Sequence, residues 1–261
     1  MHYATEYWHS IWFKFEYQLQ NNIFRKSLHS ATIMANFDVS AYNDLPSIAD
    51  ADARLEDQLA SAGLTRNQFF SKLTPVFLET PYAGRYAACL IHRHYSLNDG
   101  ERMVATGPST KPSTDTSPNI VGERWASNGE VIEHKFTEDP ASHPPPPPAE
   151  FFAKFKSILD AHGIDILGVC YAPSKYQDGF LYLESTGSED RERITTLVHC
   201  SALQLEHSFE ATWMPKANPE NESYAMGTCS NCTDGCIPSP PPCGQPPCHV
   251  SRKVVHFGIK M

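Results

Sequence analysis

The chain has 261 residues, and 21 Lys and Arg against 30 Asp and Glu leave a formal net charge of −9. A chain of this length can bury one large hydrophobic core or two small ones. The acidic balance argues against a nucleic-acid partner, because binding to phosphate backbones depends on a surplus of Lys and Arg. No stretch reaches the ~18 to 20 apolar residues of a membrane span, so we expect none.

The first 33 residues are expected to be an N-terminal extension. Trp8, Trp12 and Phe15 fall on one stripe of a helix, which fits an amphipathic helix docked on the body or a presequence-like extension. Lys14 and Glu16 interrupt the apolar core that a signal peptide needs. We therefore do not expect secretion, and we predict a cytoplasmic or nuclear protein.

Residues 34–216 are expected to form a single α+β domain that starts with helices. Apolar residues recur at helical spacing from Ser47, the predicted cap, until Gly63, a typical helix stop. A second helix is predicted to begin after the cap Thr65 and to include Phe69, Phe70, Leu73 and Phe77. Pro75 is expected to limit its end, because proline cannot donate the backbone hydrogen bond of a helix interior. Together these segments predict an αα-hairpin.

A β-hairpin is predicted next. Residues 85–96 are rich in Tyr, Cys, Leu and Ile, and an Asn-Asp-Gly turn at residues 98–100 separates them from a short strand at residues 102–105. Residues 107–118 are rich in Ser, Thr and Pro. We expect that segment to be a surface loop.

A second hairpin and a helix follow. Residues 120–125 and 131–136 repeat the pattern of strand, Asn-Gly turn and strand. Residues 150–162 place several Phe, Ile and Leu side chains on one side of a helix, and Gly163 is the predicted stop.

The remaining predicted elements are strands. Residues 164–171, 180–183 and 209–214 have strand character, whereas residues 194–205 fit either a helix or a strand. The fold class is therefore α+β: N-terminal helices, antiparallel hairpins and a mixed or antiparallel sheet with one packed helix, followed by an irregular Cys/Pro-rich tail. No glycine-rich nucleotide-binding motif occurs.

The proline-rich linker at residues 140–148 ends in five consecutive prolines. Such a run favours the stiff polyproline II conformation. We interpret it as a spacer before the helix at residues 150–162. The alternative is a ligand for the aromatic groove of a protein partner.

Five of the eight cysteines lie in the Cys/Pro-rich tail, residues 217–261. Two thiolates separated by two residues can bind one tetrahedral Zn²⁺, and further Cys or His residues would complete four ligands. The candidate zinc ligands are Cys229, Cys232, Cys236, Cys243, Cys248 and His249. Disulfides or a reduced, partly disordered tail are the alternatives, and the Asn-x-Ser/Thr sequons at Asn221 and Asn231 would suit an oxidising compartment.

His92 and His94 form a second candidate metal site. On a strand, residues two apart face the same way, ~6 to 7 Å apart along the backbone, so two imidazoles can share one metal ion. The alternative is a pair of neutral, hydrogen-bonded histidines on a half-buried sheet face.

The order Gly84, His92, His94, Glu101 and Gly107 resembles the metal-binding motif of the cupin family, in which Gly, His-x-His, Glu and Gly follow one another on a hairpin. The spacings differ, with seven residues between Gly84 and His92 and six between His94 and Glu101. The resemblance implies a metal bound by His92, His94 and Glu101, and oxygenase-type chemistry. A third histidine would have to be His134, His199 or His207.

Two further groups of residues are interpreted as structural. Cys89, Cys170 and Cys200 lie within apolar runs and are expected to be buried, inert thiols. The mixed charges at residues 190–193 are expected to form a solvated surface.

Segments 92–95, 99–101, 122–125 and 179–185 also resemble parts of uncharacterised proteins of filamentous fungi, over about residues 70–245. That resemblance implies no known activity or ligand. Two hypotheses follow from the sequence. In the first, a non-enzymatic protein uses a zinc-binding tail for a structural or interaction role; in the second, a small metalloenzyme uses His92 and His94.

Overall fold

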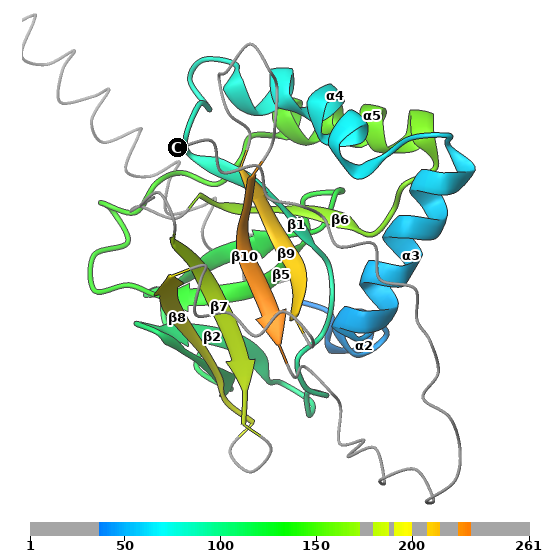
Figure 1. Cartoon of the computed structure of the whole chain (residues 1–261). Helices are drawn as coiled ribbons and strands as arrows, with labels where there is room; N and C mark the ends of the chain where they lie inside the picture. The colour runs from blue at the N-terminus through cyan, green and yellow to red at the C-terminus, as the bar shows by residue number, and fades with distance from the viewer. Residues whose placement is uncertain (1–36, 173–179, 188–190, 200–207, 215–223, 231–261) are drawn as a thin grey trace, which may run out of the picture.

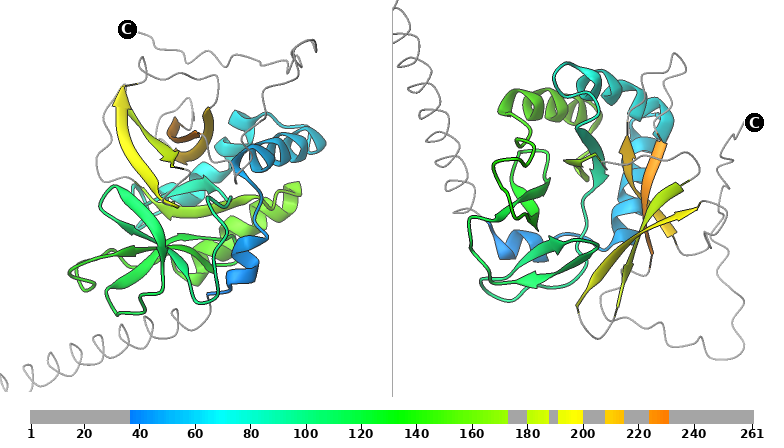
Figure 2. Two further views of the ribbon diagram at one scale, coloured as in Figure 1. Left: turned by 90° about the horizontal axis from the view of Figure 1, so that it is seen from below. Right: turned by 90° about the vertical axis from the view of Figure 1, so that its left-hand side faces the viewer.

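The computed structural model describes residues 37–172, 180–187, 191–199, 208–214 and 224–230. These residues form an α+β fold in which a mixed sheet closes into a barrel and the three longer helices pack against one side of it (Figures 1 and 2). None of the helices in these ranges combines the length and apolarity needed to cross a bilayer.

The helices begin and end largely where the sequence predicted. They are α2 (Val39–Asn43), α3 (Ile48–Ser61), α4 (Arg66–Leu78) and α5 (Ala149–His162). The Ser47 side chain caps α3, and Thr65 forms a capping box with Gln68 at the start of α4. Pro75 lies inside α4, which ends at Leu78, one residue after Phe77, the last residue that the sequence placed along this helix.

The strands are β1 (Tyr86–Leu90), β2 (Arg102–Thr106), β3 (Ser109–Ser113), β4 (Ile120–Trp125), β5 (Val131–Phe136), β6 (Leu167–Tyr171), β7 (Phe180–Thr186), β8 (Arg193–His199), β9 (Ser208–Met214) and β10 (Tyr224–Ser230). Their order around the barrel is β1-β6-β4-β5-β2-β3-β8-β7-β10-β9, and β9 closes the circle on β1. Most neighbours are antiparallel, whereas β2 with β5 and β7 with β10 are parallel.

The prediction of a hairpin between residues 85–96 and residues 102–105 is wrong. Strand β1 does not pair with β2, since β6 and β9 occupy its two hydrogen-bonding edges. Strand β2 instead forms a hairpin with β3, closed by a two-residue loop that begins at Gly107 with a positive φ of 60°. Part of the segment that was expected to be a loop is therefore a barrel strand.

Other predictions from local patterns are confirmed. Strands β4 and β5 form the second hairpin, with Gly129 at a φ of 88° in its turn. Gly163 ends α5 in the left-handed conformation. The segment that was ambiguous between helix and strand forms β8 up to His199.

Strand β10 lies within the segment that the sequence assigned to the tail. It pairs with β7 in parallel and with β9 in antiparallel orientation. The barrel therefore extends into the predicted tail up to Ser230. The N-terminal extension and the tail after Ser230 lie outside the described residues.

The two faces of β1 and β6 have different surroundings. Leu90, Leu167 and Val169 belong to the large apolar core that includes α3, α4 and α5. Cys89 and Cys170 form a separate small cluster with Ala87. Successive residues of a strand point to opposite faces, so this cluster lies on the other face of β1 and β6. Helices α3, α4 and α5 thus cover the outside of one barrel wall, and the barrel interior is a second environment. The prediction of buried thiols is confirmed for Cys89 and Cys170, whereas Cys200 lies outside the described residues.

The proline run contacts the body of its own chain. The hydroxyls of Tyr171 and Tyr86 donate hydrogen bonds to the carbonyls of Pro144 (2.7 Å) and Pro145 (2.9 Å), and Pro147 is buried. These contacts support the interpretation of the run as a spacer that leads into α5.

Candidate metal centre inside the barrel

His92 and His94 lie side by side just after β1. Their ring centroids are 4.5 Å apart, and both residues are buried. The segment is not part of a strand, but Arg93, between the two histidines, has its partners elsewhere. Its backbone N–H donates to the carbonyl of Pro46 (3.0 Å), and its side chain donates to the carbonyl of Asn43. The prediction that the two imidazoles project together is confirmed.

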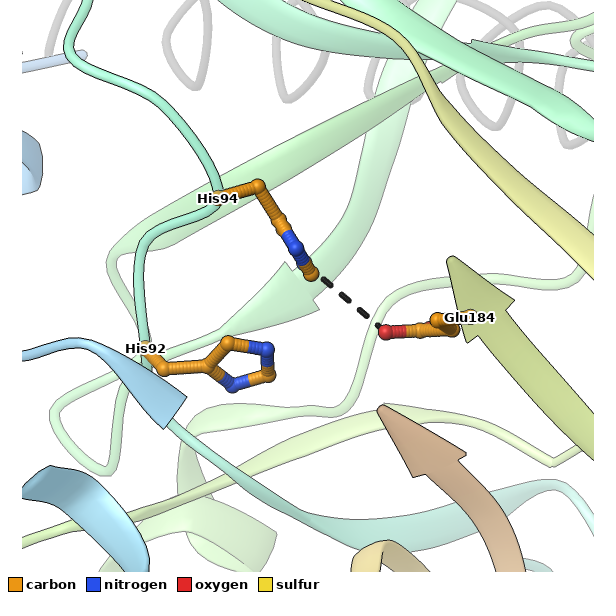
Figure 3. A group of neighbouring side chains, drawn as sticks. All are labelled: His92, His94 and Glu184. Carbon is orange, nitrogen blue, oxygen red and sulfur yellow. Dashed lines mark ion pairs between the residues drawn. The ribbon is translucent and has the colours of Figure 1, made fainter. Parts of the chain in front are cut away.

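Glu184, in the middle of β7, supplies the third donor group. One ligand atom of each of His92, His94 and Glu184 lies within 4.8 Å of the other two. Figure 3 shows the histidines approaching from one side and the carboxylate from the strand opposite. We call this group the His-His-Glu cluster.

Glu101, the acid that the cupin resemblance implied, is not part of this cluster. Its carboxylate accepts hydrogen bonds from Arg191 Nη2 (2.9 Å) and from the backbone N–H of Asn98 (2.7 Å). Glu101 thus stabilises the turn before β2. It does not reach the histidines, because β1 and β2 do not form the predicted hairpin.

The tautomer of His92 follows from a backbone contact. Nδ1 lies 2.9 Å from the carbonyl oxygen of Leu90, which can only accept a hydrogen bond, so Nδ1 carries the proton. Burial lowers the pKa of His92, so the ring is neutral. Nε2 then bears a lone pair, and this buried atom has no hydrogen-bond partner within the described part of the chain.

His94 is also neutral and also presents a lone pair on Nε2. That atom lies 2.7 Å from Nη1 of Arg193, which can only donate. Burial, and then the charge of Arg193, holds the pKa of His94 well below its usual value. The 3.4 Å approach of Glu133 Oε1 to His94 Nε2 is therefore not an ion pair.

Glu184 of the cluster and three further buried charges form one network. Arg193 Nη1 contacts Glu133 Oε2 at 2.9 Å, Arg124 Nε contacts the same oxygen at 3.2 Å, and Arg124 also pairs with Glu184. Burial would raise the pKa of Glu184, but Arg124 and Arg193 outweigh it and lower that pKa to about 2. Two cations and two carboxylates leave this network electrically neutral.

These side chains come from β4, β5, β7 and β8, and Arg193 Nη2 also donates to Thr110 Oγ1 of β3 at 2.9 Å. Side chains from strands all around a closed sheet meet only in its interior. The sequence interpretation of residues 190–193 as a solvated surface is thus wrong for Arg193, which is 3% exposed.

The chain matches no protein-family model, and we found no similar protein among curated sequences or solved structures. What the centre can do therefore has to follow from its own geometry.

Two imidazole nitrogens and one carboxylate form a donor set that suits divalent transition metals. The hydrogen bond from His92 Nδ1 to a carbonyl is the contact that usually orients a metal-binding histidine. Arg193 is the opposing feature, because its Nη1 atom lies beside the lone pair of His94.

The other proposed histidines do not join this cluster. His134 is buried on β5 with its ring centroid 5.4 Å from that of Phe37, His199 lies exposed at the end of β8, and His207 is outside the described residues. Of the predicted tail ligands, only Cys229 falls in the described chain. Its backbone on β10 is in register with Glu184 on β7. Cys232, Cys236, Cys243, Cys248 and His249 lie outside the described residues.

Sequence reasoning missed Glu184, Glu133, Arg124 and Arg193. A signal was present for Arg124, a charged residue inside the predicted strand at residues 120–125, whereas Glu184 directly follows the predicted strand at residues 180–183. A charge in such a position faces either solvent or a polar barrel interior, and the sequence does not distinguish these two environments.

Proposed function

We propose that the His-His-Glu cluster binds a divalent transition-metal ion through His92 Nε2, His94 Nε2 and the Glu184 carboxylate. The observation that carries the proposal is the Nε2 atom of His92, a buried lone pair without a hydrogen-bond partner in the described chain. Burying such an atom unsatisfied costs ~1 to 3 kcal/mol. A metal ion would satisfy this nitrogen and use a tautomer that Leu90 already selects.

We further propose that the protein is a small metalloenzyme with oxygenase-type chemistry. Two histidines and one carboxylate are the ligands of many non-haem iron(II) oxygenases, and they leave coordination positions open. Iron(II) bound there would supply oxygen activation. The chain would supply two neutral imidazoles and, because Arg124 and Arg193 keep Glu184 ionised, a charged third ligand. The cupin resemblance supports the same class, with Glu184 in place of Glu101.

Metal analysis of the full-length protein tests the metal centre. We expect the wild type, loaded with iron(II) without oxygen and then desalted, to retain one ion more than His92→Gln. His134→Gln is the matched control, because His134 is equally buried but lies outside the cluster. Equal metal content in the wild type and His92→Gln would contradict the proposal.

Nitric oxide tests the enzymatic part, since it binds iron(II) only where a coordination position is open. We expect the paramagnetic iron–nitrosyl signal in the wild type and its absence in His92→Gln. Retained iron without a nitrosyl signal would indicate a closed, structural metal site.

The tail carries a second candidate function, a zinc site with a structural or interaction role. One observation favours it: β10 anchors the backbone of Cys229 in the barrel. Zinc would then need to order only the chain beyond Ser230, which reduces the entropy that zinc binding must offset. A zinc-bound tail would present a surface to a protein partner.

Truncation after Ser230 tests this second function without removing a barrel strand. We expect the truncated chain to lose one zinc ion relative to the full chain and to keep the ion bound by the His-His-Glu cluster. Unchanged zinc content would contradict the tail site. Non-reducing mass spectrometry of the tail would then reveal disulfides, if these form instead.

A further inference from the structure

The guanidinium of Arg193 lies beside two residues of the His-His-Glu cluster. Its Nη1 atom lies 2.7 Å from His94 Nε2 and 3.7 Å from Glu184 Oε2, two of the three donor atoms of the cluster. The lone pair of His94 Nε2 can serve only one partner at a time. A metal ion and Arg193 therefore cannot both bind this nitrogen.

We propose that Arg193 is a built-in competitor for the metal, and that metal binds by exchange with this guanidinium. The inference rests on the proposed metal centre and adds the way in which the centre is regulated. Without metal, the Arg193 guanidinium contacts the metal-binding atoms of His94 and Glu184. With metal bound, the guanidinium no longer contacts these atoms.

The charge of the barrel interior supports exchange over simple addition. Arg124 and Arg193 balance Glu133 and Glu184, so a divalent ion added beside them would leave two uncompensated positive charges in a buried site. Exchange of Arg193 for the ion leaves only one uncompensated positive charge. Uncompensated buried charge is costly, so departure of the guanidinium favours metal binding.

Arg193 lies at the start of a strand whose pairing along one edge is short. It is the first residue of β8, and the register between β3 and β8 comprises only Ser109 with Ile194 and Thr110 with Arg193. The other edge of β8 pairs with β7 along its whole length. The pairing between β3 and β8 is thus short. The hydroxyl of Thr110 accepts a hydrogen bond from Arg193 Nη2 at this point of the barrel wall.

Manganese titration of the full-length protein tests the exchange. Mn²⁺ suits carboxylate and imidazole ligands better than the thiolates of the tail, and electron paramagnetic resonance measures the free ion. Arg193→Met removes the competing charge and keeps most of the side-chain volume. We expect it to bind Mn²⁺ about tenfold more tightly than the wild type, or more, since it has no charge-assisted hydrogen bond to displace.

Thr110→Val is the second variant. It keeps the shape of the side chain and leaves the metal-binding atoms of the cluster in place, and it removes only the hydroxyl that accepts the hydrogen bond from Arg193. We expect a gain in Mn²⁺ affinity of about twofold to fivefold. Arg54→Met, at a half-exposed ion pair with Asp165 on the helical side, is the control and should leave the affinity unchanged.

The outcomes separate this inference from the proposed function. If the wild type and all variants bind Mn²⁺ equally, the metal centre stands and the exchange is wrong. If neither the wild type nor any variant binds Mn²⁺, the metal centre and the exchange are both wrong. Weaker binding by a folded Arg193→Met would mean that Arg193 supports the site instead of competing for it. Should Arg193→Met fail to fold, Thr110→Val decides, and an affinity at or below that of the wild type overturns the exchange.

Discussion

Nδ1 of His92 lies 2.9 Å from the carbonyl oxygen of Leu90, two residues earlier in the chain. This contact places the imidazole proton on the side away from His94 and Glu184, so the opposite nitrogen is ready to bind a cation. The end of β1 thus orients a potential ligand before any metal arrives.

The first prediction concerns metal-dependent stability. An ion that binds only the folded state stabilises it by ~2.7 kcal/mol at a concentration one hundred times its dissociation constant. We expect this gain for the wild type with Mn²⁺ or iron(II), and its loss in His92→Phe, which lacks the nitrogen ligand. Thermal unfolding with and without the ion measures it. His134→Phe should keep the gain; an equal gain in His92→Phe would show that the ion binds elsewhere.

The second prediction concerns pH and His134. Burial and the nearby Arg102 lower the pKa of His134 to about 3, whereas the unfolded chain has a histidine pKa of about 6.5. The unfolded state therefore binds a proton first as the pH falls, so the stability contributed above pH ~6.5 is lost progressively toward pH ~3. At pH 5.5 the loss from this residue is ~1.4 kcal/mol.

Urea denaturation at pH 7.5 and pH 5.5 measures this loss. His134→Gln should show a smaller difference between the two pH values, because glutamine does not titrate. An unchanged difference would mean that His134 is charged in the folded protein or that its burial is not maintained in solution.

The third prediction concerns the buried ion pair of Arg124 and Glu184. Glu184→Gln leaves the buried Arg124 without one of its carboxylate partners, and breaking a buried pair in this way costs ~3 to 5 kcal/mol. We expect a loss at the lower end of that range, because Glu133 still contacts Arg124.

A double-mutant cycle with Arg124→Met checks the assignment. The double variant should be destabilised by less than the sum of the two single variants, since it removes both charges of one pair. Additive losses would indicate that the two residues do not interact in the folded protein.

The fourth prediction separates the helical core from the barrel interior. Phe155 on α5 is fully buried, and its ring centroid lies 5.8 Å from that of Phe77 on α4. Phe155→Ala should lower the free energy of unfolding by ~3 to 5 kcal/mol. Because Phe155 packs outside the barrel wall, the folded fraction should bind metal like the wild type.

Chemical denaturation and metal titration together test this separation. The neighbouring exposed Lys156→Ala is the control and should change stability by less than ~0.5 kcal/mol. A loss of metal affinity in Phe155→Ala would show that the helical core also positions the cluster.

The sequence by itself determined the elements whose signals are local. Thr65 with Gln68 and the helical stripe ending at Gly163 act over one or two turns, and the Asn-Gly turn before β5 needs only its own neighbours. The alternation that directs His92 and His94 to one side is equally local. These features could therefore be predicted.

Only the tertiary structure decided the third member of the cluster and the charges around it. Glu184 is far from His94 along the chain, and the barrel brings the two together because β6 and β9 occupy both edges of β1 and exclude the local hairpin. A charged residue in a strand has the same local pattern whether it faces solvent or a polar interior. Closure of the sheet fixes which of these applies, and this is why Arg193 was assigned to the surface but lies beside the histidines.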